Sequence, residues 1–158
     1  MRTAIVVGSR GQDGFYLAAN LRKKGYRVIG IDKHHRYDET GASLGRFDIL
    51  DGDQVTALIA NEQPSEIYYL AAVHQSAEDL VRDDRRLFTH SLDIHVHGLN
   101  HFLGGIAEKC PSARLFYAAS SHLFSGREPV LLDENTPREP ACIYSITKSA
   151  GVDLCHFY

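Results

Sequence analysis

The sequence has 158 residues, the length of one compact domain. Hydrophobic residues make up 44% of it and charged residues 23%, a balance typical of folded globular proteins that excludes a chain disordered over most of its length. With 17 Lys and Arg against 20 Asp and Glu, the formal net charge is −3, which argues against nucleic acid as a partner because a polyanion is repelled by a surface of the same sign.

The first part of the chain alternates short apolar strands with amphipathic helices. The β-branched, apolar run Thr3–Val7 predicts a strand that is buried on both faces. Apolar residues then recur on one helical face over Asp13–Lys24, and Gly25 follows as a stop signal. Three further elements are predicted next: a strand over Arg27–Asp32, a helix over Gln54–Ala60 and a strand over Glu66–Leu70.

The second part of the chain continues this alternation. After a loop near His74–Asp84, the spacing predicts one extended helix over about Arg85–Lys109 and a strand over Arg114–Ala118. Glycine and proline make Gly126–Pro140 mostly loop, and helical spacing returns over Tyr144–Tyr158. Strands that alternate with helices predict an α/β fold, a Rossmann-type doubly wound parallel sheet with helices on both faces.

A glycine-rich loop separates the first strand from the first helix: Gly8-Ser9-Arg10-Gly11-Gln12-Asp13-Gly14. In this position Gly8 permits a tight turn, Gly11 lets the backbone approach a diphosphate, and Gly14 lets the helix pack closely on the strand. The helix N-terminus adds free N–H donors and the positive end of its dipole. The strand before the loop and the helix after it therefore favour a dinucleotide site over a simple turn.

The end of the second strand bears on which dinucleotide binds. Asp32 lies about 20 residues after the glycine loop, where a carboxylate holds both hydroxyls of an adenosine ribose, and this favours NAD. Arg10, Lys33 and Arg36 are cations that can instead pair with a 2′-phosphate, which favours NADP. The residues alone therefore predict NAD(P) without a choice between the two forms.

An acidic stretch, Phe47-Asp48-Ile49-Leu50-Asp51, precedes the helix predicted from Gln54. From this position Asp48 can reach the adenine amino group, with Ile49 beside it. Asp51 has the residue type and the place of a helix N-cap, which is a purely structural role.

Tyr144 and Lys148 are four residues apart, which places both side chains on one face of the last predicted helix. A phenol is a poor base at neutral pH, and a nearby ammonium group stabilises its ionised form. Ser120 and Ser121 follow the fourth predicted strand, at the sheet edge where ligands of open α/β folds bind, and either can hydrogen-bond a reacting hydroxyl. The side chains together predict a catalytic site that acts on a hydroxyl group.

With these motifs the sequence resembles the extended short-chain dehydrogenase/reductases, the NAD-dependent epimerases and dehydratases of nucleotide sugars. The resemblance covers nearly the whole chain and is strongest to the GDP-mannose 4,6-dehydratase branch. It rests on Gln12-Asp13-Gly14, Tyr16-Leu17, Lys24-Gly25-Tyr26, Glu66-Ile67-Tyr68, Leu70-Ala71-Ala72 and Phe116-Tyr117.

The resemblance implies NAD(P) as cofactor and a nucleotide sugar as substrate, with a GDP-hexose favoured. It implies that Tyr144 takes the proton of the C4 hydroxyl while hydride passes to the nicotinamide, and that Lys148 tunes Tyr144 and binds the nicotinamide ribose. Ser121, or Ser120, holds the hydroxyl, and the resulting 4-keto group acidifies the C5 proton. The cofactor-binding residues implied are Gly8, Arg10, Gly11, Gln12, Asp13, Gly14, Asp32, Lys33, Asp48, Ile49, Leu70, Ala71, Ala72, Tyr144 and Lys148.

The sequence differs from the dehydratases at one catalytic position. In the dehydratases, an acidic residue two places after the catalytic Ser or Thr acts as the base at C5. Alignment from Phe116-Tyr117 puts Leu123 there, and leucine cannot accept a proton. Alignment of His122-Leu123-Phe124 with the Glu-Leu-Tyr of the dehydratases puts His122 there, and an imidazole can accept a proton near neutral pH. With Leu123 at that position, a 4-keto-sugar reductase or epimerase is the alternative.

A second departure concerns length, because residues 1–158 stop at the helix of Tyr144 and Lys148, before the last strands and the substrate domain of the family. The expectation is one incomplete NAD(P)-binding Rossmann domain without the substrate domain. The alternative function is a catalytically incomplete cofactor-binding fragment or pseudo-enzyme. The resemblance also implies a homodimer formed through the long helix and the helix of Tyr144.

The remaining sequence features bear on a metal site, on the cellular compartment and on a membrane span. Asp93, His97 and His101 recur every four residues on the long helix, but without a second ligand cluster they predict a solvated or subunit-facing stripe and no metal site. Three widely spaced cysteines without a Cys-x-x-Cys pair fit a reducing cytoplasm. No run of about 18 apolar residues indicates a membrane span.

Overall fold

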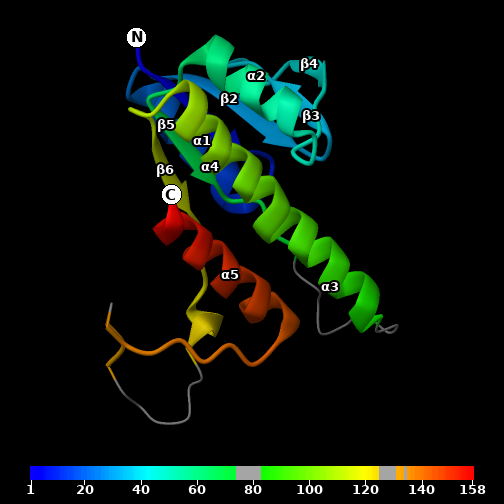
Figure 1. Ribbon diagram of the computed structural model, residues 1–158. Helices are drawn as coiled ribbons and strands as arrows, with labels where there is room; N and C mark the ends of the chain where they lie inside the picture. The colour runs from blue at the N-terminus through cyan, green and yellow to red at the C-terminus, as the bar shows by residue number, and fades with distance from the viewer. Residues whose placement is uncertain (74–82, 125–130, 134) are drawn as a thin grey trace.

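A mixed β-sheet forms the centre of the computed structural model, which describes residues 1–73, 83–124, 131–133 and 135–158 (Figure 1). Its strands are ordered β4-β3-β2-β1-β5-β6. They are β1 (Thr3–Val7), β2 (Arg27–Asp32), β3 (His35–Tyr37), β4 (Ser43–Arg46), β5 (Glu66–Tyr69) and β6 (Arg114–Tyr117). The helices are α1 (Gln12–Lys23), α2 (Gly52–Glu62), α3 (Asp84–Leu92), α4 (Gly98–Lys109) and α5 (Ile143–Phe157), with a π-helical turn η1 (Asp93–His97) and a 3₁₀ turn η2 (Ser121–Leu123).

The four strands predicted from apolar runs are confirmed, and β2, β1, β5 and β6 pair in parallel. The predicted parallel sheet is extended at one edge by two strands that were not predicted, because β3 pairs antiparallel with β2 and with β4. Lys33 and His34 form the two-residue turn between β2 and β3, with φ of +43° and +66°, the left-handed pair that suits a tight hairpin. Neither residue is glycine, and β3 and β4 lack an alternating apolar pattern, so the sequence carries no ordinary hairpin signal here.

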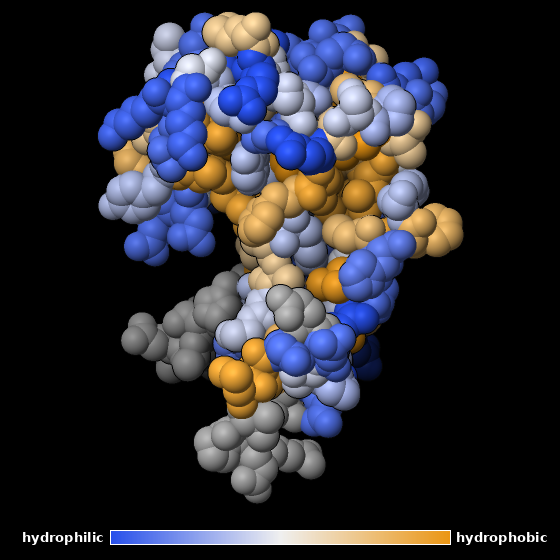
Figure 2. All heavy atoms as spheres, turned by 90° about the vertical axis from the view of Figure 1, so that its left-hand side faces the viewer, coloured by the Kyte–Doolittle hydropathy of each residue, from blue (hydrophilic) through white to orange (hydrophobic). Residues whose placement is uncertain are grey.

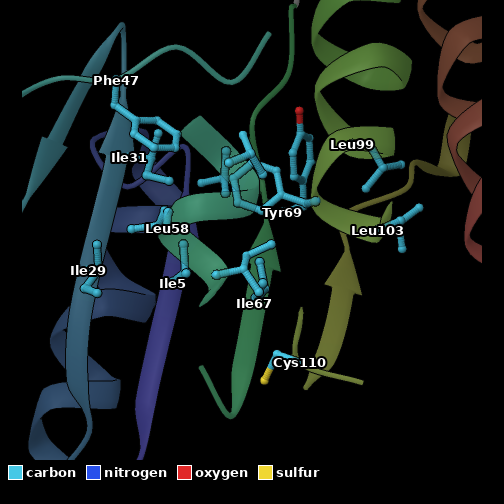
Figure 3. Close-up of a cluster of buried hydrophobic side chains, with 14 residues drawn as sticks. Ile5, Ile29, Ile31, Phe47, Leu58, Ile67, Tyr69, Leu99, Leu103 and Cys110 are labelled. Carbon is cyan, nitrogen blue, oxygen red and sulfur yellow. The ribbon is translucent and has the colours of Figure 1, made fainter. Parts of the chain in front are cut away.

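Helices cover both faces of the sheet, as predicted. α1 packs on one face against β1 and β2, whereas α2 and α4 pack on the other face and against each other. The larger core lies on this second face, where Figure 3 shows isoleucines of β1, β2 and β5 beside leucines of α2 and α4. Its buried members include Ile5, Ile29, Ile31, Leu58, Ile67, Tyr69, Leu99, Phe102 and Leu103.

The long helix predicted over about residues 85–109 is confirmed as a continuous run of α3, η1 and α4, although its π-helical turn was not predicted. α5 lies alongside this run and contacts α3 and η1 (Figure 1). Within the predicted loops, residues 74–82, 126–130 and 134 lie outside the described residues, and residues 135–140 form neither helix nor strand. Among the described residues no helix is both long and apolar enough to cross a bilayer.

One sheet edge carries exposed hydrophobic surface. Seen from the side on which β5 and β6 lie, hydrophobic side chains form a band across the middle of the molecule (Figure 2). β6 is the outer strand on this side, and its Phe116 is 54% exposed. The helices in the described part of the chain therefore leave this strand partly uncovered.

The order in which the strands are connected determines where the sheet has a crevice at its edge. From β1 the chain passes through α1 to β2 on one side, and after α2 it enters β5 on the other side of β1. In such sheets the connections after the two neighbouring strands diverge and leave a crevice at the carboxyl ends. A ligand site is therefore expected beside residues 8–14 and 70–73, which follow β1 and β5.

Gly14→Ala is expected to lower the free energy of unfolding by about 3 kcal/mol, although alanine normally stabilises a helix by about 1 kcal/mol relative to glycine. A Cβ at this position would overlap the Gly8 carbonyl oxygen and lie 2.8 Å from Ser9 Cα, so α1 would have to move away from β1. Urea unfolding measures the change. Gly11→Ala is the control, because its Cβ would make only an ordinary 3.4 Å contact; equal losses in both variants would contradict the close packing.

Candidate active site

The glycine loop brings three backbone segments into contact at the end of β1. Gly8 has φ of +90°, and a Cβ there would lie 2.9 Å from the backbone nitrogen of Ala71, which follows β5. Gly14 places the first turn of α1 directly on the Gly8 carbonyl. Both glycines are therefore required by conformation or by contact, as the motif predicted.

The N-terminus of α1 is open to an anion. Its N-cap is Gly11, in extended conformation, and no side chain caps the helix. Gly11 is exposed, and a Cβ there would touch only the Gly8 carbonyl, which leaves room above the loop. The N–H groups of this turn and the positive helix end suit a diphosphate, so the residues present fit a dinucleotide cofactor.

Asp32 is oriented by the glycine loop, because its Oδ2 accepts a hydrogen bond of 2.8 Å from the backbone N–H of Arg10. The Arg10 guanidinium lies over the Tyr37 ring, 4.3 Å from its centroid. Arg36 points elsewhere and forms an ion pair with Glu62 of α2. The carboxylate therefore stands beside the loop, whereas two of the three cations predicted for a 2′-phosphate have other partners.

The acidic stretch before α2 has local structural roles. The Asp48 side chain accepts a hydrogen bond from the Leu50 N–H at 3.0 Å. Asp51 caps α2 by accepting from the Gln54 N–H at 3.0 Å, so the structural interpretation of this residue is confirmed. Ile49 packs against the main core.

Lys148 is a buried cation on α5. Its side chain is only 1% exposed, and Nζ donates a 2.7 Å hydrogen bond to the carbonyl of Ala118, just after β6. The ammonium lies 4.8 Å from the Tyr117 ring centroid and 5.9 Å from that of Tyr144. Burial lowers the pKa of Lys148 to about 8. The predicted Tyr-Lys pair is therefore brought together at the carboxyl end of β6.

Two imidazole rings meet the Tyr144 ring edge-on. The His95 centroid is 5.3 Å from that of Tyr144 and the His122 centroid is 6.1 Å away. His122 is exposed on η2, whereas Leu123, the other candidate for the same role, is 4% exposed and packed inside. Of the two residues, His122 is thus the one that lies beside the phenol.

The two candidate serines differ in their contacts. Ser120 is the N-cap of η2, and its Oγ accepts from the His122 N–H at 3.1 Å. Ser121 begins the turn and is exposed. The exposed hydroxyl of Ser121 is accordingly the better placed to meet a substrate.

His95 is a site residue that the sequence analysis did not single out. It is fully buried in η1 and hydrogen-bonds both the Val73 N–H and the Thr147 hydroxyl. The sequence feature that could have identified His95 is its spacing. His95 falls four residues after Ser91 and four before Leu99, which places all three on the buried face of the long helix.

The histidine stripe on the opposite side of this helix forms no metal cluster. His97 pairs with Asp93 at 3.2 Å, whereas His101 hydrogen-bonds the Ile49 carbonyl at 3.0 Å. The described residues hold no group of three or more side chains that could bind a metal ion.

Comparison with known proteins identifies similar chains. The sequence pattern of the NAD dependent epimerase/dehydratase family matches residues 4–158. GDP-mannose 4,6 dehydratase 2 of Caenorhabditis elegans is 28% identical over 169 residues, which cover 95% of this chain and 43% of that protein. UDP-glucuronate 4-epimerase 1 of Arabidopsis thaliana is 25% identical over 168 residues, covering 99% and 38%. The chain thus spans less than half the length of these relatives.

Solved structures confirm the fold. UDP-glucose 4-epimerase from Brucella ovis, in complex with NAD, superposes with a TM-score of 0.81 at 17% identity, covering 100% of this chain and 48% of that one. The dTDP-4-dehydrorhamnose reductase from Bacillus anthracis, in complex with NADP, gives a TM-score of 0.80 at 22% identity, covering 99% and 50%. The Rossmann-type architecture predicted from the sequence is therefore confirmed.

The free energy of unfolding of the wild-type chain is expected to rise with pH above about 8, and Lys148→Met is expected to abolish this rise. The pKa of Lys148 is about 8 in the folded chain and about 10.4 in an unfolded one. Between these values the unfolded chain binds more protons, so the free energy of unfolding rises by up to about 1.4 kcal/mol per pH unit. Burial raises the pKa values of Tyr69 and Tyr117, which opposes this rise only at higher pH.

Urea unfolding at several pH values between about 8 and 9.5 measures this slope. The exposed Lys23, changed to Met, is the matched control and should keep the wild-type slope. A Lys148→Met variant with the same slope as wild type would show that the ammonium is not buried.

Proposed function

The chain belongs to the NAD dependent epimerase/dehydratase family, and we propose that it oxidises the C4 hydroxyl of a nucleotide-linked hexose. The observation that carries this proposal is the meeting of Tyr144 and Lys148 on α5 at the carboxyl end of β6. The glycine loop and residues 70–73 border the same edge of the sheet. A hydroxyl bound beside Tyr144 therefore lies near the place where a dinucleotide fits.

The charges around the glycine loop suggest which protein groups bind each part of the cofactor. The α1 N-terminus takes the diphosphate, and Asp32 takes the adenosine ribose hydroxyls. NAD is favoured over NADP because the Asp32 carboxylate repels a 2′-phosphate while Arg10 and Arg36 already have partners. When bound, the nicotinamide supplies the hydride acceptor and, for the reverse step, the donor.

Tyr144 takes the proton of the substrate hydroxyl, since its ring lies near both Lys148 and His122 of η2, whereas the Tyr117 hydroxyl is directed to the His95 carbonyl. The Lys148 ammonium favours the ionised phenol by its charge. Ser121 orients the hydroxyl by a hydrogen bond from the start of η2. The three side chains thus hold and deprotonate the group that loses hydride.

We favour a GDP-hexose as substrate and elimination after oxidation. The support is the similarity to GDP-mannose 4,6-dehydratases together with the place of His122, which lies exposed beside Tyr144 while Leu123 is buried. An imidazole there can remove the C5 proton that the 4-keto group acidifies. A UDP-hexuronate and epimerisation at C4 are the alternative, because UDP-glucuronate 4-epimerases match the chain equally widely.

The helices α3 and α5 form the dimer face in this proposal. Hydrophobic side chains are exposed on both, including Phe88 on α3 and Ile146 and Phe157 on α5. Such residues on neighbouring helices suit burial against a second copy of the chain.

Tyr144→Phe is expected to lower kcat at least 100-fold, because the hydroxyl then has no base. The chain is incubated with NAD⁺ or NADP⁺ and GDP-mannose, UDP-glucuronate or UDP-glucose, and the 4-keto sugar and the C4 epimer of each substrate are measured. Tyr158→Phe is the matched control, since that phenol is at the C-terminal end of the same helix but hydrogen-bonds Asn100. Full activity of Tyr144→Phe would refute the assigned base. Tight cofactor binding without conversion of any sugar would instead indicate a cofactor-binding module.

His122→Asn is expected to lower product formation about 100-fold while hydride transfer to the cofactor persists. The reaction is run in deuterated water, and mass spectrometry follows deuterium at C5 of the sugar. The wild-type chain should incorporate deuterium and the variant should not. Incorporation by the variant at the wild-type rate would contradict the assignment of His122, whereas turnover by the wild-type chain without incorporation would favour the 4-keto-sugar reductase or epimerase.

A further inference from the structure

His95 joins two parts of the candidate site that are distant in sequence. Its Nε2 is 2.9 Å from the backbone nitrogen of Val73, which lies just beyond β5. Its Nδ1 is 2.8 Å from Oγ1 of Thr147, which lies between Tyr144 and Lys148 on α5. Both bonds are inside the protein, because His95 and Thr147 are each 0% exposed.

The partners of His95 determine its protonation. A backbone N–H can only donate, so Nε2 must present its lone pair to Val73. Nδ1 then carries the proton and donates to Thr147, whose hydroxyl donates in turn to the carbonyl of Ile143 or Tyr144 at 3.0 and 3.1 Å. Only the neutral ring satisfies every polar atom in this chain of bonds. Burial also lowers the pKa of His95 to about 3, and the charges of Lys148 and His90 act in the same direction.

The π-helical turn fixes the ring at this place. The Ile94 carbonyl accepts a 2.6 Å hydrogen bond from the Tyr69 hydroxyl, and the Tyr117 hydroxyl is 3.5 Å from the His95 carbonyl. Gly151 lets α5 approach, since a Cβ there would lie 2.9 Å from the same His95 oxygen. η1 is thereby attached to β5, β6 and α5 at once, and the imidazole has little freedom to turn.

We propose that His95 is a positioning residue that couples the cofactor-binding backbone after β5 to Tyr144 and Lys148 on α5. A dinucleotide at the glycine loop lies against residues 71–73, because Ala71 already contacts Gly8. When the cofactor orders this backbone, the effect is transmitted to Thr147 through the hydrogen bonds of the two His95 ring nitrogens. The same ring meets Tyr144 edge-on at 5.3 Å. The inference rests on the proposed function, because it assigns to the bound cofactor a second role, that of ordering the base.

The test compares hydrogen exchange with and without NADH in wild type, Thr147→Val and Thr147→Ser. NADH is expected to slow exchange at residues 143–150 of the wild-type chain. Thr147→Val has the shape of threonine but no hydroxyl, so this protection should fall at least threefold while NADH affinity, measured by fluorescence, changes less than threefold. Thr147→Ser keeps the hydroxyl and should restore the protection. Equal protection in Thr147→Val and wild type would overturn the coupling.

His95→Gln and His95→Leu give an independent comparison. The glutamine amide offers one acceptor and one donor and should retain part of the protection, whereas leucine should remove it. Nitrogen NMR of the wild-type imidazole should show the proton on Nδ1 from pH 8 down to pH 5, despite the neighbouring Lys148 and His90. A ring that titrates within this range would overturn the positioning role. Failure of the wild-type chain to bind NADH would contradict the proposed function itself, whereas binding without a change in α5 contradicts the coupling alone.

Discussion

The close approach of backbone to backbone at the end of β1 determines where this protein can bind a ligand. Gly8 turns the chain with a positive φ against Ala71, and Gly14 seats α1 on the Gly8 carbonyl. Because no side chain stands in these contacts, the first turn of α1 points its N–H groups into the crevice between β1 and β5. The same loop also orients Asp32 through the Arg10 N–H. One packing constraint thus places the open N-terminus of α1 and the Asp32 carboxylate, the two groups proposed to hold the cofactor, together.

The opposite side of the crevice is built from buried polar groups. Lys148 and His95 are buried although both carry ionisable groups, and Ser91 of α3 has a buried hydroxyl with no partner among the described residues. Such groups weaken a fold unless hydrogen bonds compensate for the lost water. Lys148 has this compensation in its hydrogen bond to the Ala118 carbonyl, and His95 has it in its bonds to Val73 and Thr147. Perturbed groups gathered beside a crevice are typical of functional sites and argue for catalysis over a purely structural role.

The features predicted correctly from the sequence are those set by local pattern. Continuous apolar runs indicated β1, β2, β5 and β6, and the four-residue spacing indicated that Tyr144 and Lys148 share a helical face. The β2–β3 hairpin was missed because its turn uses Lys33 and His34 in left-handed conformation, which residue type does not reveal. His95 was missed because its role depends on a π-helical turn and on Val73, far away in sequence. The sequence pattern along the chain therefore predicted most of the helices and strands. It did not predict the hairpin or the hydrogen-bond partners of His95, which depend on tertiary structure.

Two parts of the site divide the chemistry between them. The residues proposed for oxidation are held by long elements, with Lys148 on α5 and the glycine loop between β1 and α1, so their geometry follows from the core. In the proposed function, the step that follows oxidation depends on the three-residue turn η2. Ser120 caps that turn and Leu123 holds it inside the protein, which leaves His122 beside Tyr144. Because exchange of one exposed residue in η2 leaves the core and the Tyr-Lys pair intact, related chains can keep the hydride step and still differ between elimination, epimerisation and reduction.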